Sequence, residues 1–343
     1  MSAVVPALLA ELERLGVRPA GVCADSRLVQ AGDLFVAMPG HRVDGRQFAA
    51  DAVARGAAAV VHEAGADLVL PVPALPVSGL AALAGEIAHQ ILGQPSERLW
   101  LVGITGTNGK TSVSQWIAQA LGLLDCKCAV IGTLGNGYPG QTRDSLNTTP
   151  DAVSVHRLLA GFAAESAAAC AMEVSSIGLD QQRVAGVAFD VAVFTNLTRD
   201  HLEYHGTMEA YGEAKARLFH WSGLKAAVVN LDDAFAARLA ADLEGHVPVI
   251  GYTLEDRPGG DRNLAARKLS MSGAGIAFEV DGVPFAAPVV GRFNASNLLA
   301  VTGALLADGI SLEDIAAVLG RVQPPPGRMQ ALGGDGRPLV GVD

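Results

Sequence analysis

The sequence lacks any long uninterrupted apolar run, although half of its 343 residues are hydrophobic. Much of this hydrophobicity is alanine, and no stretch of about 20 apolar residues is free of charges or helix breakers, which excludes membrane-spanning helices. The first residues also lack the basic start and continuous apolar segment of a signal peptide. Leu8, Leu9, Leu12 and Leu15 instead recur at helical spacing, which predicts a surface helix.

Cysteine and basic residues are also scarce. The four cysteines are too few and too scattered for a disulfide framework or a zinc site, so we expect reduced thiols and a cytoplasmic protein. Lys and Arg number 25 against 35 Asp and Glu, which gives a formal net charge of -10. This balance argues against a nucleic-acid partner, because phosphate backbones are held by clustered Lys and Arg. A small anionic ligand needs only a local positive site, so the net negative charge does not exclude one.

Two glycine- and proline-containing breaks divide the chain into regions with different residue patterns. Through the first part of the chain, short apolar runs alternate with glycine and proline, which predicts a small α/β unit. Gly93–Gln94–Pro95–Ser96 then marks a boundary, and Gln323–Pro324–Pro325–Pro326–Gly327 forms a second, stiff connector. The sequence therefore predicts domains over residues 1–95 and 96–328, followed by a short stub at 329–343.

The second region alternates strand-like and helix-like stretches. Leu99–Ile104 is a short apolar run suited to a buried parallel strand, and Lys110–Leu124 has helical spacing. Further strand-like runs follow at Cys128–Ile131, Ala168–Val174, Val191–Phe194 and Ala226–Val229. Strands that alternate with helices predict a mostly parallel sheet covered on both faces. The expected fold class is therefore α/β, with a small N-terminal α/β domain before a mostly parallel domain of the phosphate-loop type.

The strongest motif is a glycine-rich turn between the first of these strands and its helix, Gly106–Thr107–Asn108–Gly109–Lys110–Thr111. Glycines let backbone N–H groups surround a phosphate, and the helix N-terminus adds partial positive charge. Lys110 would contact the β- and γ-phosphates of ATP, and the Thr111 hydroxyl would bind Mg²⁺. The strict pattern has glycine where this chain has Ile104, so the loop is a variant. The alternative is a glycine turn with an incidental lysine, and ATP binding is favoured over it.

Two further polar clusters offer metal ligands. Glu173 follows an apolar strand, where an acid in phosphate-loop enzymes commonly holds Mg²⁺, although a surface glutamate is the alternative. The segment Phe194–His205 brings polar groups to the C-terminal end of another strand, where open α/β sheets bind ligands. Within it, His201 is interpreted as a metal or phosphate contact rather than a packed or exposed histidine. Lys215, on the next helix, is interpreted from its spacing alone as a solvated lysine.

The order of these motifs resembles the Mur ligase family over nearly the whole chain. GITGTNGKT, residues 103–111, is similar to the variant loop of Mur ligases and of the related folylpolyglutamate synthetases. Asp25–Ser26–Arg27, Pro39–Gly40–His41 and Asp44–Gly45–Arg46 resemble the UDP-holding N-terminal domain of the members that add the third amino acid of the peptide. Each motif is weak alone, because turn chemistry explains its glycines and aspartates.

The resemblance implies several nucleotide and metal contacts. It implies that Lys215 is carbamylated, which would turn a cation into an anion that helps hold Mg²⁺ together with Thr111, Glu173 and His201. It implies that Asn294 and Asn297 face the nucleotide base, since amides both donate and accept hydrogen bonds, although one of them could simply cap its helix. Arg328 is a further expected nucleotide contact.

The resemblance also implies contacts to the substrate. The expected substrate-binding residues are Ser26, Arg27, His41, Asn147, Thr148, Thr149, Ser175, Gln181 and Arg183. Arg183 suits the D-glutamyl carboxylate, because a guanidinium pairs with two oxygens. Many members have histidine where this chain has Ile177, so that position is assigned no role.

The implied reaction is an ATP-dependent amide-bond formation. The carboxylate of UDP-N-acetylmuramoyl-L-alanyl-D-glutamate attacks the γ-phosphate of ATP and forms an acyl phosphate and ADP. The amino group of an amino acid, meso-diaminopimelate in preference to L-lysine, then displaces phosphate. Lys110, Glu173, His201 and Lys215 form the expected catalytic set, and we expect a monomer that does not insert into membranes.

Two alternatives stay open, and the end of the chain bears on both. Members of the family continue into a third domain, whereas this sequence stops at Asp343, so we expect the 343-residue chain to bind its ligands with little ligase turnover. The first alternative is a folylpolyglutamate synthetase-like ligase, which has no need of a UDP-binding domain. The second is a non-catalytic fragment that binds a nucleotide sugar.

Overall fold

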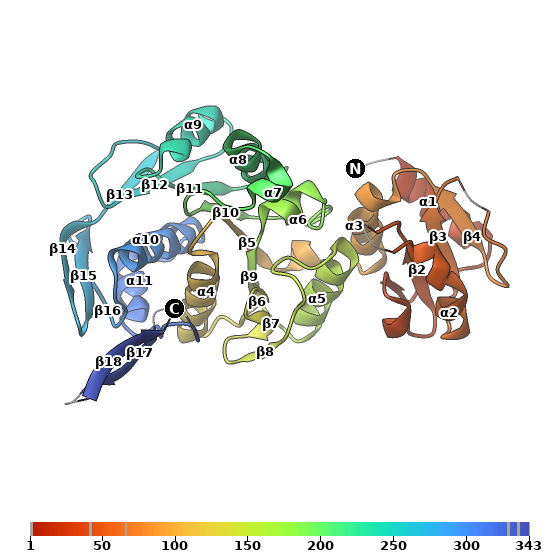
Figure 1. The fold of residues 1–343 in the computed structure, drawn as a ribbon, viewed down its shortest axis with the longest axis horizontal. Helices are drawn as coiled ribbons and strands as arrows, with labels where there is room; N and C mark the ends of the chain where they lie inside the picture. The colour runs from red at the N-terminus through yellow and green to blue at the C-terminus, as the bar shows by residue number, and fades with distance from the viewer. Residues whose placement is uncertain (1–2, 41–42, 66, 328–329, 335–336, 343) are drawn as a thin grey trace. The chain divides into compact units, whose positions relative to one another are not determined.

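The computed structural model describes residues 3–40, 43–65, 67–327, 330–334 and 337–342, the last two segments by their backbone alone. The chain divides into two compact units (Figure 1). Unit 1 comprises residues 1–98, 150–165 and 180–187, and unit 2 comprises residues 99–149, 166–179 and 188–343. Unit 1 is thus assembled from three separate stretches of sequence.

Unit 1 is built on a four-stranded, fully parallel sheet with the order β1-β2-β3-β4. Its N-terminal helix confirms the predicted surface helix, because Leu8 and Leu12 are buried while Leu15 is exposed just beyond its end. The elements are α1 (Val4–Arg14), β1 (Gly21–Cys23), η1 (Ser26–Leu28), β2 (Asp33–Ala37), η2 (Gly45–Phe48), α2 (Ala49–Ala54), β3 (Ala59–Glu63), β4 (Ala74–Val77), α3 (Leu80–Ile91), η3 (Pro95–Arg98) and α5 (Ala152–Ala164).

Unit 2 is built on a nine-stranded sheet with the order β13-β12-β11-β10-β5-β9-β6-β7-β8. The pairs from β13 to β6 are parallel, and the pairs β6–β7 and β7–β8 at one edge are antiparallel. Its strands are β5 (Trp100–Thr105), β6 (Cys128–Gly132), β7 (Gly135–Tyr138), β8 (Gln141–Arg143), β9 (Ala169–Glu173), β10 (Val191–Phe194), β11 (Ala226–Asn230), β12 (Val249–Thr253) and β13 (Arg262–Ala265).

Helices cover both faces of this sheet. Figure 1 shows α4, α10 and α11 on one face and α8 and α9 on the other. The central strands are buried along their length, which explains why they read as continuous apolar runs. The helices of unit 2 are α4 (Lys110–Leu123), α6 (Ser176–Asp180, which ends at the boundary), α7 (Leu202–His205), α8 (Met208–Ala216), η4 (Arg217–His220), α9 (Ala234–Leu243), α10 (Arg292–Ala307) and α11 (Leu312–Leu319).

The predicted α/β class and mostly parallel sheet are confirmed, whereas a separate small sheet was not anticipated. Strands β14 (Arg267–Ser272), β15 (Gly275–Val280) and β16 (Val283–Ala287) form an antiparallel sheet of their own. Two more strands, β17 (Gln330–Gly334) and β18 (Arg337–Val342), form a hairpin. In the described residues, no helix combines the length and apolar character needed to cross a membrane.

Candidate nucleotide-binding site

The glycine-rich loop joins β5 to α4 and takes a conformation that two of its glycines make possible. Gly106 has a φ of 141° and Gly109, the residue before α4, has a φ of 88°. A Cβ on Gly106 would lie 1.9 Å from Thr195 Oγ1, and one on Gly109 would lie 2.4 Å from Asn297 Oδ1. Both positions therefore require glycine for backbone geometry and for close packing.

The segment after β10 holds this loop in place. The Asn108 amide N–H donates to Asn196 Oδ1 at 3.0 Å, and the Asn196 side-chain amide donates back to Asn108 O at 3.1 Å. Thr195 Oγ1 also donates to Asn108 O, at 2.6 Å, and the Thr107 N–H donates to Asn196 O at 2.8 Å. Residues 195 and 196 thus fix the loop conformation, a role that the sequence did not reveal.

The lysine of the loop turns back onto its own backbone. Lys110 Nζ donates to Gly106 O at 2.8 Å and to Thr107 O at 2.9 Å. This places the ammonium beside the backbone turn whose geometry suits a phosphate group.

Glu173 ends β9 and meets the first turn of α4. Its side chain is buried, with 1% of the residue exposed. Glu173 Oε2 accepts hydrogen bonds from the hydroxyls of Thr111 and Thr133, both at 3.0 Å, and Oε1 accepts one from the Thr133 N–H at 2.9 Å. Burying a carboxylate is costly unless a cation or several donors compensate. Here every hydrogen bond recorded among the described residues comes from a neutral donor.

This arrangement fits a divalent cation bound together with nucleotide. The described residues contain no group of three or more His, Cys, Asp and Glu side chains placed for a metal ion. Mg²⁺ in nucleotide sites takes only one or two ligands from protein carboxylates and the rest from phosphate and water. The Thr111 hydroxyl and the Glu173 carboxylate, 3.0 Å apart, form such a minimal donor set.

Lys215 lies on α8 and is 1% exposed, so its interpretation as a solvated lysine is wrong. Its Nζ donates to Gly106 O at 2.9 Å and lies 4.3 Å from the centre of the Tyr211 ring. Burial, and secondarily the nearby charge of Lys110, lowers the pKa of Lys215 from 10.5 to about 6, while Asp200 opposes the shift. The amine is therefore mostly neutral at pH 7.

His201 lies at the entrance to α7 and is partly exposed, with 42% of its side chain accessible. Its ring nitrogens approach Asp200 at 3.7 Å and Glu203 at 3.5 Å. Its ring packs edge-on against Tyr211, with the ring centres 6.2 Å apart. Tyr211, which the sequence did not single out, thus contacts both His201 and Lys215, and its hydroxyl lies 3.2 Å from Thr107 Oγ1.

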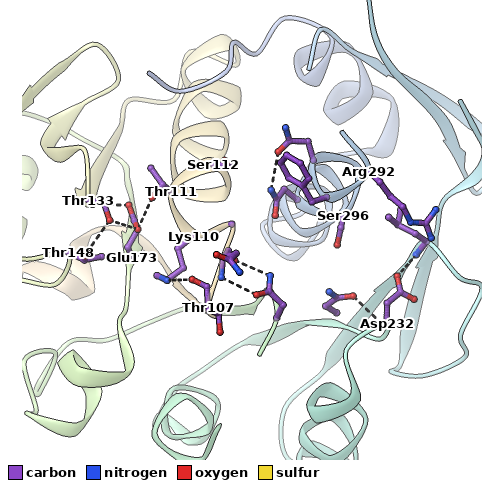
Figure 2. Close-up of a pocket in the computed structure, with 18 of the residues that line it drawn as sticks. Thr107, Lys110, Thr111, Ser112, Thr133, Thr148, Glu173, Asp232, Arg292 and Ser296 are labelled. Carbon is purple, nitrogen blue, oxygen red and sulfur yellow. Dashed lines mark hydrogen bonds between the residues drawn. The ribbon is translucent and has the colours of Figure 1, made fainter. Parts of the chain in front are cut away.

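A pocket of about 800 Å³ opens over the loop, and Figure 2 shows the side chains that surround it. It lies entirely within unit 2. Its lining includes many of the expected residues: Thr107, Asn108, Gly109, Lys110, Thr111, Thr148, Glu173, Asn294 and Asn297. It also includes residues that the sequence did not single out: Ser112, Thr133, Asn196, Asn230, Asp232, Leu254, Glu255, Arg292, Phe293 and Ser296.

The two asparagines at the start of α10 are joined to each other. Asn297 Nδ2 donates to Asn294 Oδ1 at 3.1 Å, and Asn294 Nδ2 donates to Val290 O at 2.8 Å. Across the pocket, the Asp232 carboxylate accepts from the Thr253 hydroxyl at 2.5 Å and from the Leu254 N–H at 2.7 Å. Asp232 follows β11 as Glu173 ends β9, so the strand-end position that indicated Glu173 could also have indicated Asp232.

The expected substrate-binding residues fall into both units. In unit 2, Thr149 is fully buried, and its hydroxyl donates to Glu173 O at 3.0 Å and accepts from the Ser175 N–H at 3.0 Å. Asn147 is exposed in the same segment. In unit 1, the Arg183 guanidinium donates to Gln181 Oε1 at 2.7 and 3.0 Å.

The remaining expected contacts lie in unit 1, outside the described residues or, for Gly106, beside the pocket in unit 2. Ser26 is buried in η1, whereas Arg27 is exposed and forms an ion pair with Asp25 at 2.7 Å. His41 and Arg328 lie outside the described residues. Gly106 supplies the carbonyl on which Lys110 and Lys215 converge, but the pocket lining does not include it.

Comparisons with known proteins match two stretches of the chain to one family. Residues 104–305 match the Mur ligase middle domain, and residues 19–90 match the Mur ligase family catalytic domain. A relative from Pseudomonas aeruginosa, named UDP-N-acetylmuramoyl-L-alanyl-D-glutamate–2,6-diaminopimelate ligase, is 50% identical over 93% of this chain and 66% of its own length. A relative of the same name from Chromobacterium violaceum is 48% identical over 98% of this chain and 69% of its own length.

Solved structures show the same fold. One ligase of that name superposes with a TM-score of 0.80 at 35% identity, covering 92% of this chain and 65% of its own. A folylpolyglutamate synthase from Mycobacterium tuberculosis has a TM-score of 0.59 at 18% identity, covering 76% of this chain and 66% of its own, which shows a shared fold alone. The chain spans about two thirds of the length of the first of these curated relatives. From the family matches and the level of identity, this chain belongs to the Mur ligase family.

Proposed function

We propose that this chain carries the nucleotide-binding part of an ATP-dependent ligase that adds meso-diaminopimelate to UDP-N-acetylmuramoyl-L-alanyl-D-glutamate in peptidoglycan precursor synthesis. The observation that carries the proposal is the pocket in which Lys110, Thr111 and Glu173 meet at the glycine loop. The names of the relatives that are about 50% identical supply the reaction.

The nucleotide would be held by the loop and its neighbours. Lys110 would turn from the carbonyls of Gly106 and Thr107 toward the phosphates, where its charge offsets theirs. Thr111 and Glu173 would hold Mg²⁺, which when bound stabilises negative charge on the transferred phosphoryl group. Asn294 and Asn297 line the same pocket and would lie at the base end. The Arg328 side chain is proposed as a further nucleotide contact.

Lys215 would act after modification. A carbamate forms when a neutral amine attacks CO2 and loses a proton, and the burial that keeps Lys215 neutral favours this step. The resulting anion, near the carbonyl of Gly106, would add negative charge beside the loop and so favour Mg²⁺. His201, which is partly exposed beside Tyr211, is proposed to help hold Mg²⁺.

Further expected residues would contact the acceptor. We propose that Arg183 and Gln181 bind the D-glutamyl group, and that Asn147, Thr148, Thr149 and Ser175 position the muramyl-dipeptide. Ser26, Arg27 and His41, in the domain proposed for residues 1–95, would hold the UDP group. The nucleotide domain is proposed to span residues 96–328. We further propose that the protein is a cytoplasmic monomer.

A calorimetric titration tests the proposed acceptor. The chain is titrated with UDP-N-acetylmuramoyl-L-alanyl-D-glutamate, with the shorter L-alanyl compound as control and with ADP in the presence of Mg²⁺ as a separate ligand. We expect binding of ADP and tighter binding of the dipeptide form than of the shorter compound. Preference for the shorter compound would assign the chain to an earlier step of the pathway. Binding of ADP with no binding of either UDP compound would overturn the acceptor assignment.

A further inference from the structure

Two of the three hydrogen bonds to the Glu173 carboxylate come from Thr133, in the two-residue turn between β6 and β7. Thr133 follows β6 and begins the turn into β7, since Gly132 pairs with Gly135 across the hairpin. Thr133 contacts both carboxylate oxygens, with its N–H on Oε1 at 2.9 Å and its hydroxyl on Oε2 at 3.0 Å. No other residue described here donates to both oxygens of Glu173, so this turn sets the orientation of the carboxylate.

The residue before the turn leaves room for the carboxylate. A Cβ on Gly132 would lie 2.2 Å from Glu173 Oε1 and 2.7 Å from its Cδ. The Glu173 side chain therefore occupies the space that the Cβ of any larger residue at position 132 would take. Packing and hydrogen bonding thus fix the same rotamer of Glu173.

The direction of the hydrogen bonds follows from counting protons. Thr133 Oγ1 lies 3.0 Å from Glu173 Oε2 and 3.1 Å from Thr148 Oγ1, and it has a single proton. The Thr133 hydroxyl donates that proton to Glu173 Oε2, so it has none left for Thr148. Thr148 must then donate to Thr133, and Figure 2 shows these contacts beside Thr111 at the pocket wall. The chain of donors runs from Thr148 through Thr133 to Glu173.

We infer that Thr133 is a positioning residue for the metal site, which holds Glu173 in the orientation that lets it share a divalent cation with Thr111. The inference rests on the proposed function, because it assumes that Mg²⁺ accompanies the nucleotide. Thr111 must turn its hydroxyl from Glu173 to bind a cation through oxygen, and the carboxylate then loses one of its three donors. The two donors of Thr133 remain and keep Glu173 in place.

The test compares variants by their dependence on Mg²⁺ rather than by activity. ADP affinity is measured by calorimetry over a series of Mg²⁺ concentrations and again with a chelator. Thr133→Val keeps the shape and the backbone N–H but removes the hydroxyl, and Thr133→Ser restores it. Thr142→Val is the matched control, because the Thr142 hydroxyl, on the neighbouring strand β8, donates to Leu134 O at 2.7 Å and has no hydrogen bond to Glu173 among those described.

We expect Thr133→Val to raise the Mg²⁺ concentration needed for half-maximal strengthening of ADP binding by about tenfold, the loss typical of removing a partner of a metal ligand. Metal-free ADP binding should stay unchanged, and Thr133→Ser and Thr142→Val should behave like the original chain. An unchanged Mg²⁺ dependence in Thr133→Val, or equal weakening with and without metal, would overturn the inference while leaving the proposed function intact. If Mg²⁺ has no effect on ADP binding by the unsubstituted chain, both the inference about Thr133 and the proposed metal site are wrong.

Discussion

Lys215 illustrates how burial changes the chemistry of one side chain. From its spacing it was expected to face solvent, yet it is buried against Tyr211 and hydrogen-bonded to a loop carbonyl from a distant part of the sequence. Tertiary contacts of this kind are not encoded in local periodicity. The resemblance to Mur ligases did indicate that the residue is unusual, whereas physical reasoning about the sequence alone did not.

The neutral amine leads to a test of the proposed modification. When the protein is equilibrated with 13C-labelled bicarbonate near pH 8, we expect a carbamate signal in the 13C NMR spectrum, because the pKa of Lys215 lies at about 6 and the amine is then unprotonated. Lys215→Met should abolish the signal. Lys225→Met should retain it, since Lys225 is exposed, paired with Asp190 at 2.7 Å, and has a raised pKa. A signal that survives Lys215→Met would refute the assignment.

Helix α4 shows which parts of an element can be predicted from sequence. Its bounds and the strand before it follow from apolar spacing and from the glycine loop, and the structure confirms both to within one residue. The partners of the loop could not be predicted in the same way. Asn196, in the segment after β10, and Asn297, on α10, lie about 90 and 190 residues further along the chain, and nothing near either one in sequence shows that it contacts the loop.

The same substitution to alanine is expected to weaken ADP binding at one glycine of this region and to stabilise the fold at another. Gly109→Ala should weaken ADP binding by at least about tenfold, because the new methyl would meet Asn297 Oδ1 at 2.4 Å in a backbone with a φ of 88°. Gly122→Ala, in the last turn of α4, where a Cβ would meet nothing within 4 Å beyond the helix's own backbone, should leave binding unchanged and raise the free energy of unfolding by at most about 0.5–1 kcal/mol. Calorimetry and chemical denaturation measure the two effects. Equal binding by both variants would contradict this role of Gly109.

At the scale of the whole molecule, distant segments meet in the core of unit 1. His156 on α5 is fully buried, its Nε2–H donates to Ala185 O at 2.9 Å, and its ring lies 5.1 Å from that of His89. His156 Nδ1 is buried with no hydrogen-bond partner among the described residues. A second proton on this ring would therefore have no acceptor there, and burial lowers the pKa of His156 from 6.5 to about 4.

This histidine is expected to make the fold sensitive to acid. Between pH 6.5 and 4 the unfolded chain binds a proton that the folded chain does not, so the free energy of unfolding falls as the pH falls. The lowered pKa of His156 reduces the free energy of unfolding by an amount on the order of 3 kcal/mol, and this loss is complete below about pH 4. Urea denaturation at several pH values should show a shallower decline for His156→Gln than for the original chain. His246→Gln, at an exposed position, should follow the original chain, and identical pH profiles for all three would exclude the effect.

The compact units of the structure follow the breaks in the sequence only at one place. The break near residues 93–96 lies close to the end of the first segment of unit 1, at residue 98. Composition gave no sign that residues 150–165 and 180–187 return to that unit, because both segments look like ordinary parts of the alternating α/β pattern. Their return depends on packing, such as the approach of Ala185 O to Gly85, where a Cβ would lie within 2.0 Å.

The three-segment construction of unit 1 affects how the protein can fold during synthesis. The chain passes between the two units five times, so residues 1–98 emerge from the ribosome long before α5 and residues 180–187 are made. Until then, the apolar side of α3 that packs against Val153 has no cover. A nascent chain holding only the first segment would thus be a target for chaperones, and folding of the N-terminal unit would have to wait for translation of about half the sequence.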